Sequence, residues 1–147
     1  MPFQSKDYIL RMIEQLGRAL SRLLEQIRGG SVDELPEIEA DLNVIAHQAG
    51  LDLKLAHSLS RESLSILVGY GDDLDPSRCW LLAELLYLHG LQTEKRTGEA
   101  AARESYSRSL YLYRMVRPEW QAEIPLPAAP ARVAELERRL GNHGATN

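Results

Sequence analysis

Apolar side chains recur along residues 6–28 with the spacing of an amphipathic helix. They follow the i, i+3, i+4, i+7 pattern that places an apolar stripe on one face of a helix. The stripe consists of Ile9, Met12, Ile13, Leu16, Leu20, Leu23, Leu24 and Ile27. Gly29 and Gly30 follow directly, and glycine commonly ends a helix, so we expect this helix to stop there.

Residues 31–70 are expected to form the helical middle of the chain. Ser31 and Glu34 have the spacing of a capping box, which predicts the start of a second helix. Its apolar stripe is Leu35, Ile38, Leu42, Ile45, Ala46 and Ala49. We expect Gly50 to end it, followed by short helices over 51–58 and 60–68 and a loop at 69–73.

Residues 76–117 predict a helical hairpin. Asp75 is a good N-cap and Pro76 suits the first helical position, so a helix should begin there and run to about Arg96. Its centre, 79–88, is apolar nearly all round, which is typical of a helix covered on several sides. Thr97 and Gly98 predict the turn, and residues 99–117 the second helix of the hairpin.

Four prolines interrupt the chain after this hairpin, at positions 118, 125, 127 and 130. They predict an extended segment over 118–130, since proline does not fit a helix interior. Trp120, Ile124 and Leu126 are spaced so that they can face one surface, so we expect the segment to dock on the body. A last short helix over 129–140 and a frayed tail over 141–147 complete the prediction.

Composition supports the same picture. The chain has 25 Leu and 15 Ala against only 5 Val, 7 Ile and 3 Thr, a preference for helix formers over β-branched residues. Its 147 residues fit one domain that needs no disulfide to fold. We therefore predict an all-α fold, with five to seven helices in a single domain spanning 1–147.

Part of the predicted hairpin resembles a tetratricopeptide repeat. Trp80, Ala83 and Tyr87 have the spacing of the repeat's first helix, and the second helix follows its Ala-x-x-x-aromatic-x-x-Ala-Leu run with serine in place of one alanine. Those second-helix residues are Ala102, Tyr106, Ser109 and Leu110. The resemblance implies that Trp80 and Tyr87 pack against the face from Ala102 to Leu110. Glu84 stands where the repeat usually has glycine, which leaves Gly90 as the expected point of close contact.

The opening residues 7–16 resemble the start of an uncharacterised family of short bacterial helical proteins. That resemblance implies a similar fold and a bacterial origin. The predicted structural core follows from the stripes and from the hairpin. It comprises Leu16, Leu20, Leu42, Trp80, Ala83, Tyr87, Ala102, Tyr106 and Leu110.

Charge and cysteine content narrow the functional classes. The net charge of −4 argues against a general nucleic-acid binder. Acidic residues concentrate in the middle, where 31–90 hold eleven acidic and three basic side chains. Cys79 is the one cysteine, which excludes an internal disulfide and suits a reducing compartment. No apolar segment has the form of a signal peptide or a membrane span, so we expect a soluble, cytoplasmic protein.

The residues that could carry chemistry do not assemble into a catalytic motif. Neither His-Glu-x-x-His nor Glu-x-x-His surrounds any of His47, His57, His89 and His143, so no metal site and no cofactor is expected. Glu37 and Asp41 lie one turn apart, as a general acid and base would, but a solvated face explains them better. Cys79 falls in the first turn of a predicted helix, where a buried small residue is the plainer interpretation.

The leading hypothesis is therefore a non-catalytic protein-interaction or scaffold module. The alternative is a helical pocket for a small molecule or a peptide, including an enzymatic one. Arg78 and His89 are the candidates for partner contact. We also expect a homodimer, because a leucine face of helix 76–96 (Leu81, Leu85 and Leu88) would otherwise expose apolar surface. The rival is a monomer in which helix 6–28 covers that face within one chain. Docking on a membrane surface is a further, less favoured option.

Overall fold

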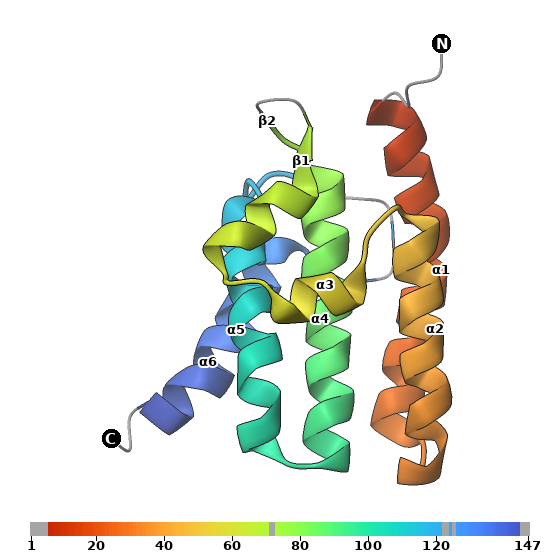
Figure 1. Ribbon diagram of the computed structural model, residues 1–147, viewed down its shortest axis with the longest axis vertical. Helices are drawn as coiled ribbons and strands as arrows, with labels where there is room; N and C mark the ends of the chain where they lie inside the picture. Colours follow the sequence, from red (N-terminus) through yellow and green to blue (C-terminus); the bar gives the residue numbers. More distant parts are fainter. Residues whose placement is uncertain (1–5, 71–72, 122–123, 125, 145–147) are drawn as a thin grey trace.

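The computed structural model describes residues 6–70, 73–121, 124 and 126–144, and within them the fold is all-α (Figure 1). Six α-helices account for most of this part of the chain. They are α1 (Lys6–Gly29), α2 (Leu35–Gln48), α3 (Leu53–Ser58), α4 (Pro76–Arg96), α5 (Glu99–Met115) and α6 (Ala129–Gly144). Two 3-10 segments, η1 (Val32–Glu34) and η2 (Glu62–Val68), and two short antiparallel strands, β1 (Gly69–Tyr70) and β2 (Asp73–Leu74), join them.

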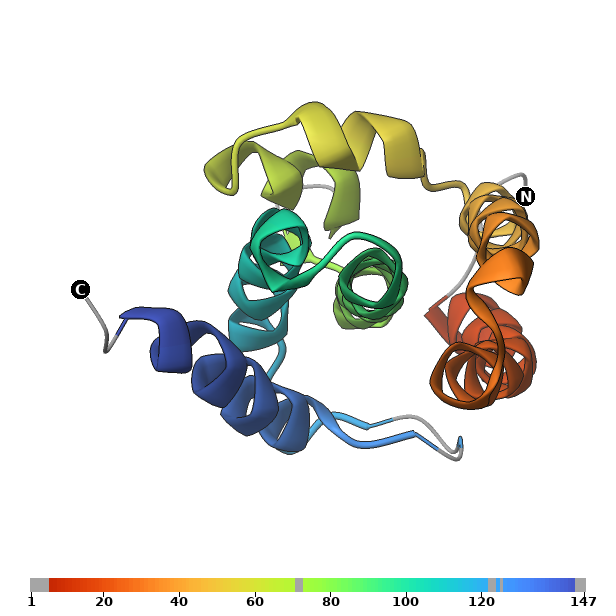
Figure 2. The same cartoon turned by 90° about the horizontal axis from the view of Figure 1, so that it is seen from below.

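Helix α4 lies at the centre of the molecule (Figure 2). Every residue from Cys79 to Leu88 is buried, as the apolar pattern of this segment predicts. The helices α1 and α2 cover one side of α4, α5 covers another, and α3 and η2 lie across a third. Asp75 begins the helix as expected, because its carboxylate accepts hydrogen bonds from the backbone N–H groups of Ser77 (3.0 Å) and Arg78 (3.3 Å).

The apolar stripe of α1 is buried within the chain. Leu20 has no exposed surface, and α1 packs against both α4 and α2. Leu81, Leu85 and Leu88 of α4 are also fully buried. The expected reason for a homodimer, an uncovered leucine face on α4, is therefore absent from the folded chain.

The α4–α5 hairpin has the close contact that its sequence predicts. The rings of Tyr87 and Tyr106 lie 6.3 Å apart, and the hydroxyl of Ser109 donates a 2.8 Å hydrogen bond to the carbonyl of Ala83. A Cβ atom on Gly90 would meet the Tyr106 ring at 2.5 Å, so glycine is needed where the two helices approach.

The expectation for Trp80 needs correction. The thiol of Cys79 donates to the carbonyl of Leu112 (3.1 Å), so the start of α4 lies beside the end of α5 and not beside Ala102. The ring of Trp80 has the ring of Trp120 as its aromatic neighbour, 6.2 Å away. The antiparallel register of the hairpin thus separates Trp80 from the end that carries Ala102.

The described part of the segment 118–130 docks on the body, as the spacing of its apolar residues predicts. Trp120, Ile124 and Leu126 all pack against the core. The side chain of Ile124 fills the space where Gly17 of α1 lacks a side chain. This segment therefore links the C-terminal part of the fold to α1.

Two local expectations are wrong. Ser31 makes no capping hydrogen bond, because residues 32–34 form a 3-10 turn and the Glu34 carboxylate lies near Gly30 instead. Helix α6 continues through Gly141 to Gly144, so residues 141–144 are not a frayed tail. Residues 145–147 lie outside the described part.

Candidate functional site

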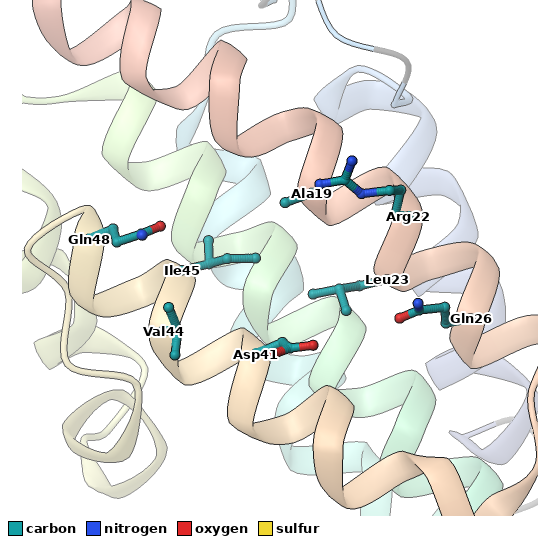
Figure 3. Close-up of a pocket in the computed structure, with 8 residues that line it drawn as sticks. All are labelled: Ala19, Arg22, Leu23, Gln26, Asp41, Val44, Ile45 and Gln48. Atoms are coloured by element: carbon teal, nitrogen blue, oxygen red, sulfur yellow. The ribbon is translucent and has the colours of Figure 1, made fainter.

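A groove of about 300 Å³ lies between α1 and α2, with α4 behind it (Figure 3). Its lining residues are Ala19, Arg22, Leu23, Gln26, Asp41, Val44, Ile45 and Gln48. Leu23 and Ile45 are buried and form an apolar floor. Val44 stands at the edge with 54% of its surface exposed, although it is an apolar residue. The groove therefore combines an apolar floor with an apolar side chain that nothing in the described chain covers.

Polar side chains form both walls of this groove. Arg22 comes from α1 and Asp41 from α2, and both are exposed. Neither makes an ion pair with any residue that the structure describes. Glu37, one turn from Asp41, is exposed as well, so these two carboxylates do not form an acid–base pair in a closed cleft.

A second polar cluster surrounds His89, one of the residues expected to contact a partner. Its Nδ1 lies 3.0 Å from the hydroxyl of Ser105, and its Nε2 lies 3.4 Å from Glu39. The ring of His57 is 4.2 Å away, centroid to centroid. The cluster thus joins α2, α3, α4 and α5, four elements that are far apart in the sequence.

The two histidines of this cluster are held in their neutral form at neutral pH. Burial, together with the neighbouring His89 and Arg108, lowers the pKa of His57 to about 4. Burial also lowers the pKa of His89, although the Glu39 carboxylate opposes that shift. The order Ser105–His89–Glu39 is that of a nucleophile relay, but Ser105 is only 5% exposed, which keeps substrates from its hydroxyl.

Arg78, the other candidate for partner contact, ties parts of the chain together. Its guanidinium donates to the carbonyl oxygens of Ala49 (3.4 Å), Gly50 (3.2 Å) and Leu67 (3.4 Å). Gly50 has a φ of 73°, a backbone conformation that favours glycine. Arg78 therefore holds the turn after α2 and the end of η2 against the start of α4. Its role is structural, and the terminal nitrogens of its guanidinium are occupied by contacts within the chain.

A buried ionic network lies on the far side of α4 from the groove. Glu84 has no exposed surface and is paired with Arg132 of α6, which is 1% exposed. The pairing is bidentate, with Nη2 2.8 Å and Nε 3.1 Å from the two carboxylate oxygens. The hydroxyl of Tyr113 also donates to Glu84. Each charged atom at the centre of this network thus has a partner.

The network continues along α6. The guanidinium of Arg132 lies 4.0 Å from the centre of the Tyr87 ring, and the Tyr87 hydroxyl donates to Glu135. Arg139 then links Glu135 (3.0 Å) to Glu94 (3.3 Å). Burial raises the pKa of Tyr87 to about 12, so its hydroxyl remains a hydrogen-bond donor even at a pH above the ordinary tyrosine value of about 10. These contacts attach α6 to the α4–α5 hairpin.

The sequence contained one signal for this network. Glu84 interrupts an otherwise apolar run at the centre of the predicted hairpin, and a buried carboxylate needs a partner. The pattern did not indicate which cation supplies it. Arg132 follows the proline-rich segment, 48 residues further along the chain, and only the docking of α6 brings it to Glu84.

Cys79 is buried, as expected of a small core residue. Burial raises the pKa of its thiol to about 12, with a further contribution from Asp75. Because the thiolate is the nucleophilic form, this cysteine is unreactive at neutral pH.

The described residues contain no group of three or more histidine, cysteine or acidic side chains placed to hold a metal ion. The arginines of α5 also have partners inside the molecule. Arg103 donates to the carbonyl of Leu140 and Arg108 to the carbonyl of Leu59, while Arg114 pairs with Glu137. Tyr106 and Tyr113 are buried, so α5 does not present a surface of stacked aromatic and basic side chains.

Comparison of the chain with protein families, with curated proteins and with solved structures found no match. Within the described part of the chain, none of the helices combines the length and the apolar character required to cross a bilayer.

Proposed function

We propose that this protein is a non-catalytic interaction module that binds another protein chain through the α1–α2 groove. The observation that carries the proposal is the exposure of Val44 above an apolar floor, between Arg22 and Asp41, which have no ion pair among the described residues. Protein interfaces commonly combine an apolar centre with a polar rim. The groove supplies both on the surface of two regular helices.

The other polar clusters support a role without catalysis. Arg78 and the Glu84–Arg132 pair are engaged in holding helices together. The buried hydroxyl of Ser105 and the raised pKa of Cys79 keep both groups from acting as nucleophiles. As part of the proposal we retain a tetratricopeptide-like character for the α4–α5 hairpin, supported by the contact of Gly90 with Tyr106. A bacterial, cytoplasmic protein is also retained, and the buried free thiol fits a reducing compartment.

A pocket for a small molecule or a peptide is the second candidate function. A cavity of about 240 Å³ beside Trp80 favours it. Its wall is formed by Trp80, Gln121, Ile124, Leu126, Pro127 and Ala128. This volume is below the usual range for ligand pockets, roughly 300–1,000 Å³. The interaction role is the better supported of the two because Val44 exposes 54% of its surface at the α1–α2 groove. Ligand binding there would change the fluorescence of Trp80.

Site-specific photo-crosslinking tests the proposed role. A photoreactive phenylalanine analogue replaces Val44 in the groove, and a matched chain carries it at Arg138, an exposed residue of α6. We expect a discrete cross-linked adduct from position 44 and none from position 138 when each chain is irradiated in the cells that make it. The interaction role through this groove fails if neither position cross-links or if both give the same adducts.

A further inference from the structure

The two helices that form the groove carry opposite charge on their exposed sides. We call this surface the α1–α2 face. On α1, exposed polar side chains follow one another at helical spacing and are mostly basic: Arg11, Gln15, Arg18 and Arg22. On α2 the corresponding exposed stripe is acidic, with Glu37 and Asp41 followed by Val44 and Gln48. Helix α2 contains no lysine or arginine at all.

The charges of the α1–α2 face make no ion pairs within the part of the chain that the structure describes. Arg18, Arg22, Glu37 and Asp41 make no ion pair with any residue that the structure describes. Elsewhere on the molecule exposed arginines are of both kinds: Arg114 pairs with Glu137 at 2.9 Å, whereas Arg138 has no ion pair among the described residues. A partner with an acidic stripe opposite α1 and a basic stripe opposite α2 complements these charges.

A second copy of this chain has that arrangement of charge, and we propose that it is the occupant of the α1–α2 face. The inference rests on the proposed function and names the partner of the same groove. A twofold axis parallel to the two helices sets α1 of one copy against α2 of the other. Because such an interface uses the same patch twice, Arg22 meets Asp41 of the partner copy at two equivalent places.

The apolar residues of the face fit the same pairing. Val44 is 54% exposed, and the twofold arrangement turns it towards α1 of the other copy. There the small side chain of Ala19 and the floor residue Leu23 leave room for it. Helix dimensions make the face roughly 20 Å long, since α2 has 14 residues at about 1.5 Å each. An interface of this size is at the small end of the range, so the dimer is reversible and depends on concentration.

Reversal of each charge separately tests the pairing. In R22D an aspartate at position 22 faces Asp41 of the other copy, and in D41R an arginine at position 41 faces Arg22 of the other copy. Two copies of the same variant therefore repel each other. We expect the dissociation constant of each variant to rise by at least about tenfold relative to the unaltered chain. An equimolar mixture of R22D and D41R restores both charge pairs, so it should form a heterodimer. Light scattering coupled to size exclusion gives the masses, and native mass spectrometry distinguishes the heterodimer from either homodimer.

Three results would overturn the inference. The first is an unaltered chain that remains at 16.6 kDa from micromolar to near-millimolar concentration. The second is a dimer that neither reversal weakens, which would place the interface elsewhere. The third is a mixture of the two variants that stays monomeric while circular dichroism shows both to be folded. If the chain is monomeric but still cross-links to a different protein through position 44, the self-pairing fails and the interaction role stands.

Discussion

The two sides of α4 treat ionic groups in opposite ways. On the α5–α6 side, Glu84 and Arg132 are buried and every charged atom at their contact has a hydrogen-bond partner. On the α1–α2 side, Arg22 and Asp41 line one groove yet remain unpaired among the described residues. The same kinds of side chain therefore serve stability in one place and remain available for binding in the other. The difference lies in burial, because Glu84 and Arg132 are buried whereas Arg22 and Asp41 are exposed to solvent.

The buried pair should give the largest effect on stability. Arg132→Ala leaves the Glu84 carboxylate buried without its cation, which costs about 3–5 kcal/mol in the free energy of unfolding. Urea denaturation followed by circular dichroism measures this change. Arg138→Ala, at an exposed position of the same helix, is the matched control and should change the free energy by less than about 0.5 kcal/mol. A loss below about 1 kcal/mol for Arg132→Ala would contradict the importance of the network.

Alanine substitutions at two helical glycines, Gly90 and Gly17, test how tightly the side chains beside them are packed. In Gly90→Ala the new methyl group meets the Tyr106 ring, whose hydroxyl is held by Glu94 at 2.9 Å, so we expect a loss of about 1–3 kcal/mol. In Gly17→Ala it meets the side chain of Ile124, which is only partly buried and can change rotamer, and alanine favours the helix by up to about 1 kcal/mol. Thermal and urea melts should show the smaller loss for Gly17→Ala. An equal or reversed order would mean that the side chain of Ile124 is held as firmly as the ring of Tyr106.

The histidine cluster predicts a smaller effect that depends on pH. The pKa of His57 is lowered from its usual value of 6.5 to about 4, so the unfolded chain binds a proton more readily than the folded one. Stability should therefore fall as the pH drops from about 6.5 towards 4. The full shift corresponds to about 3 kcal/mol, and solvent screening of this partly exposed ring reduces the expected loss to roughly 1–2 kcal/mol.

Urea melts of His57→Gln across the same pH range check this. The variant should lose part of the decline, whereas His47→Gln, at an exposed position of α2, should keep it. A decline of the same size in His57→Gln would assign the pH dependence to other groups.

The helices and their directions of burial could be read from local pattern. The stripe of α1, the Asp75 cap with Pro76 and the apolar centre of α4 each depend on neighbours within a few turns. Their bounds were predicted closely for α4 and α5, and the contact of Gly90 with Tyr106 follows from the same hairpin. The capping box at Ser31 failed because a 3-10 turn competes locally with an α-helical start.

The sites were decided by tertiary structure. The stripe of α1 showed that one surface must cover it, but the pattern could not distinguish α4 of the same chain from a second copy. Likewise His57 and His89 are 32 positions apart in the sequence, and the contact of their rings depends on how α3 crosses α4. Hydrophobic periodicity specifies which face of a helix is buried. It does not specify the surface that covers this face, because the hydrophobic effect is non-directional. The choice of partner for a buried charge depends on the distances and angles of hydrogen bonds, which only the packed helices determine.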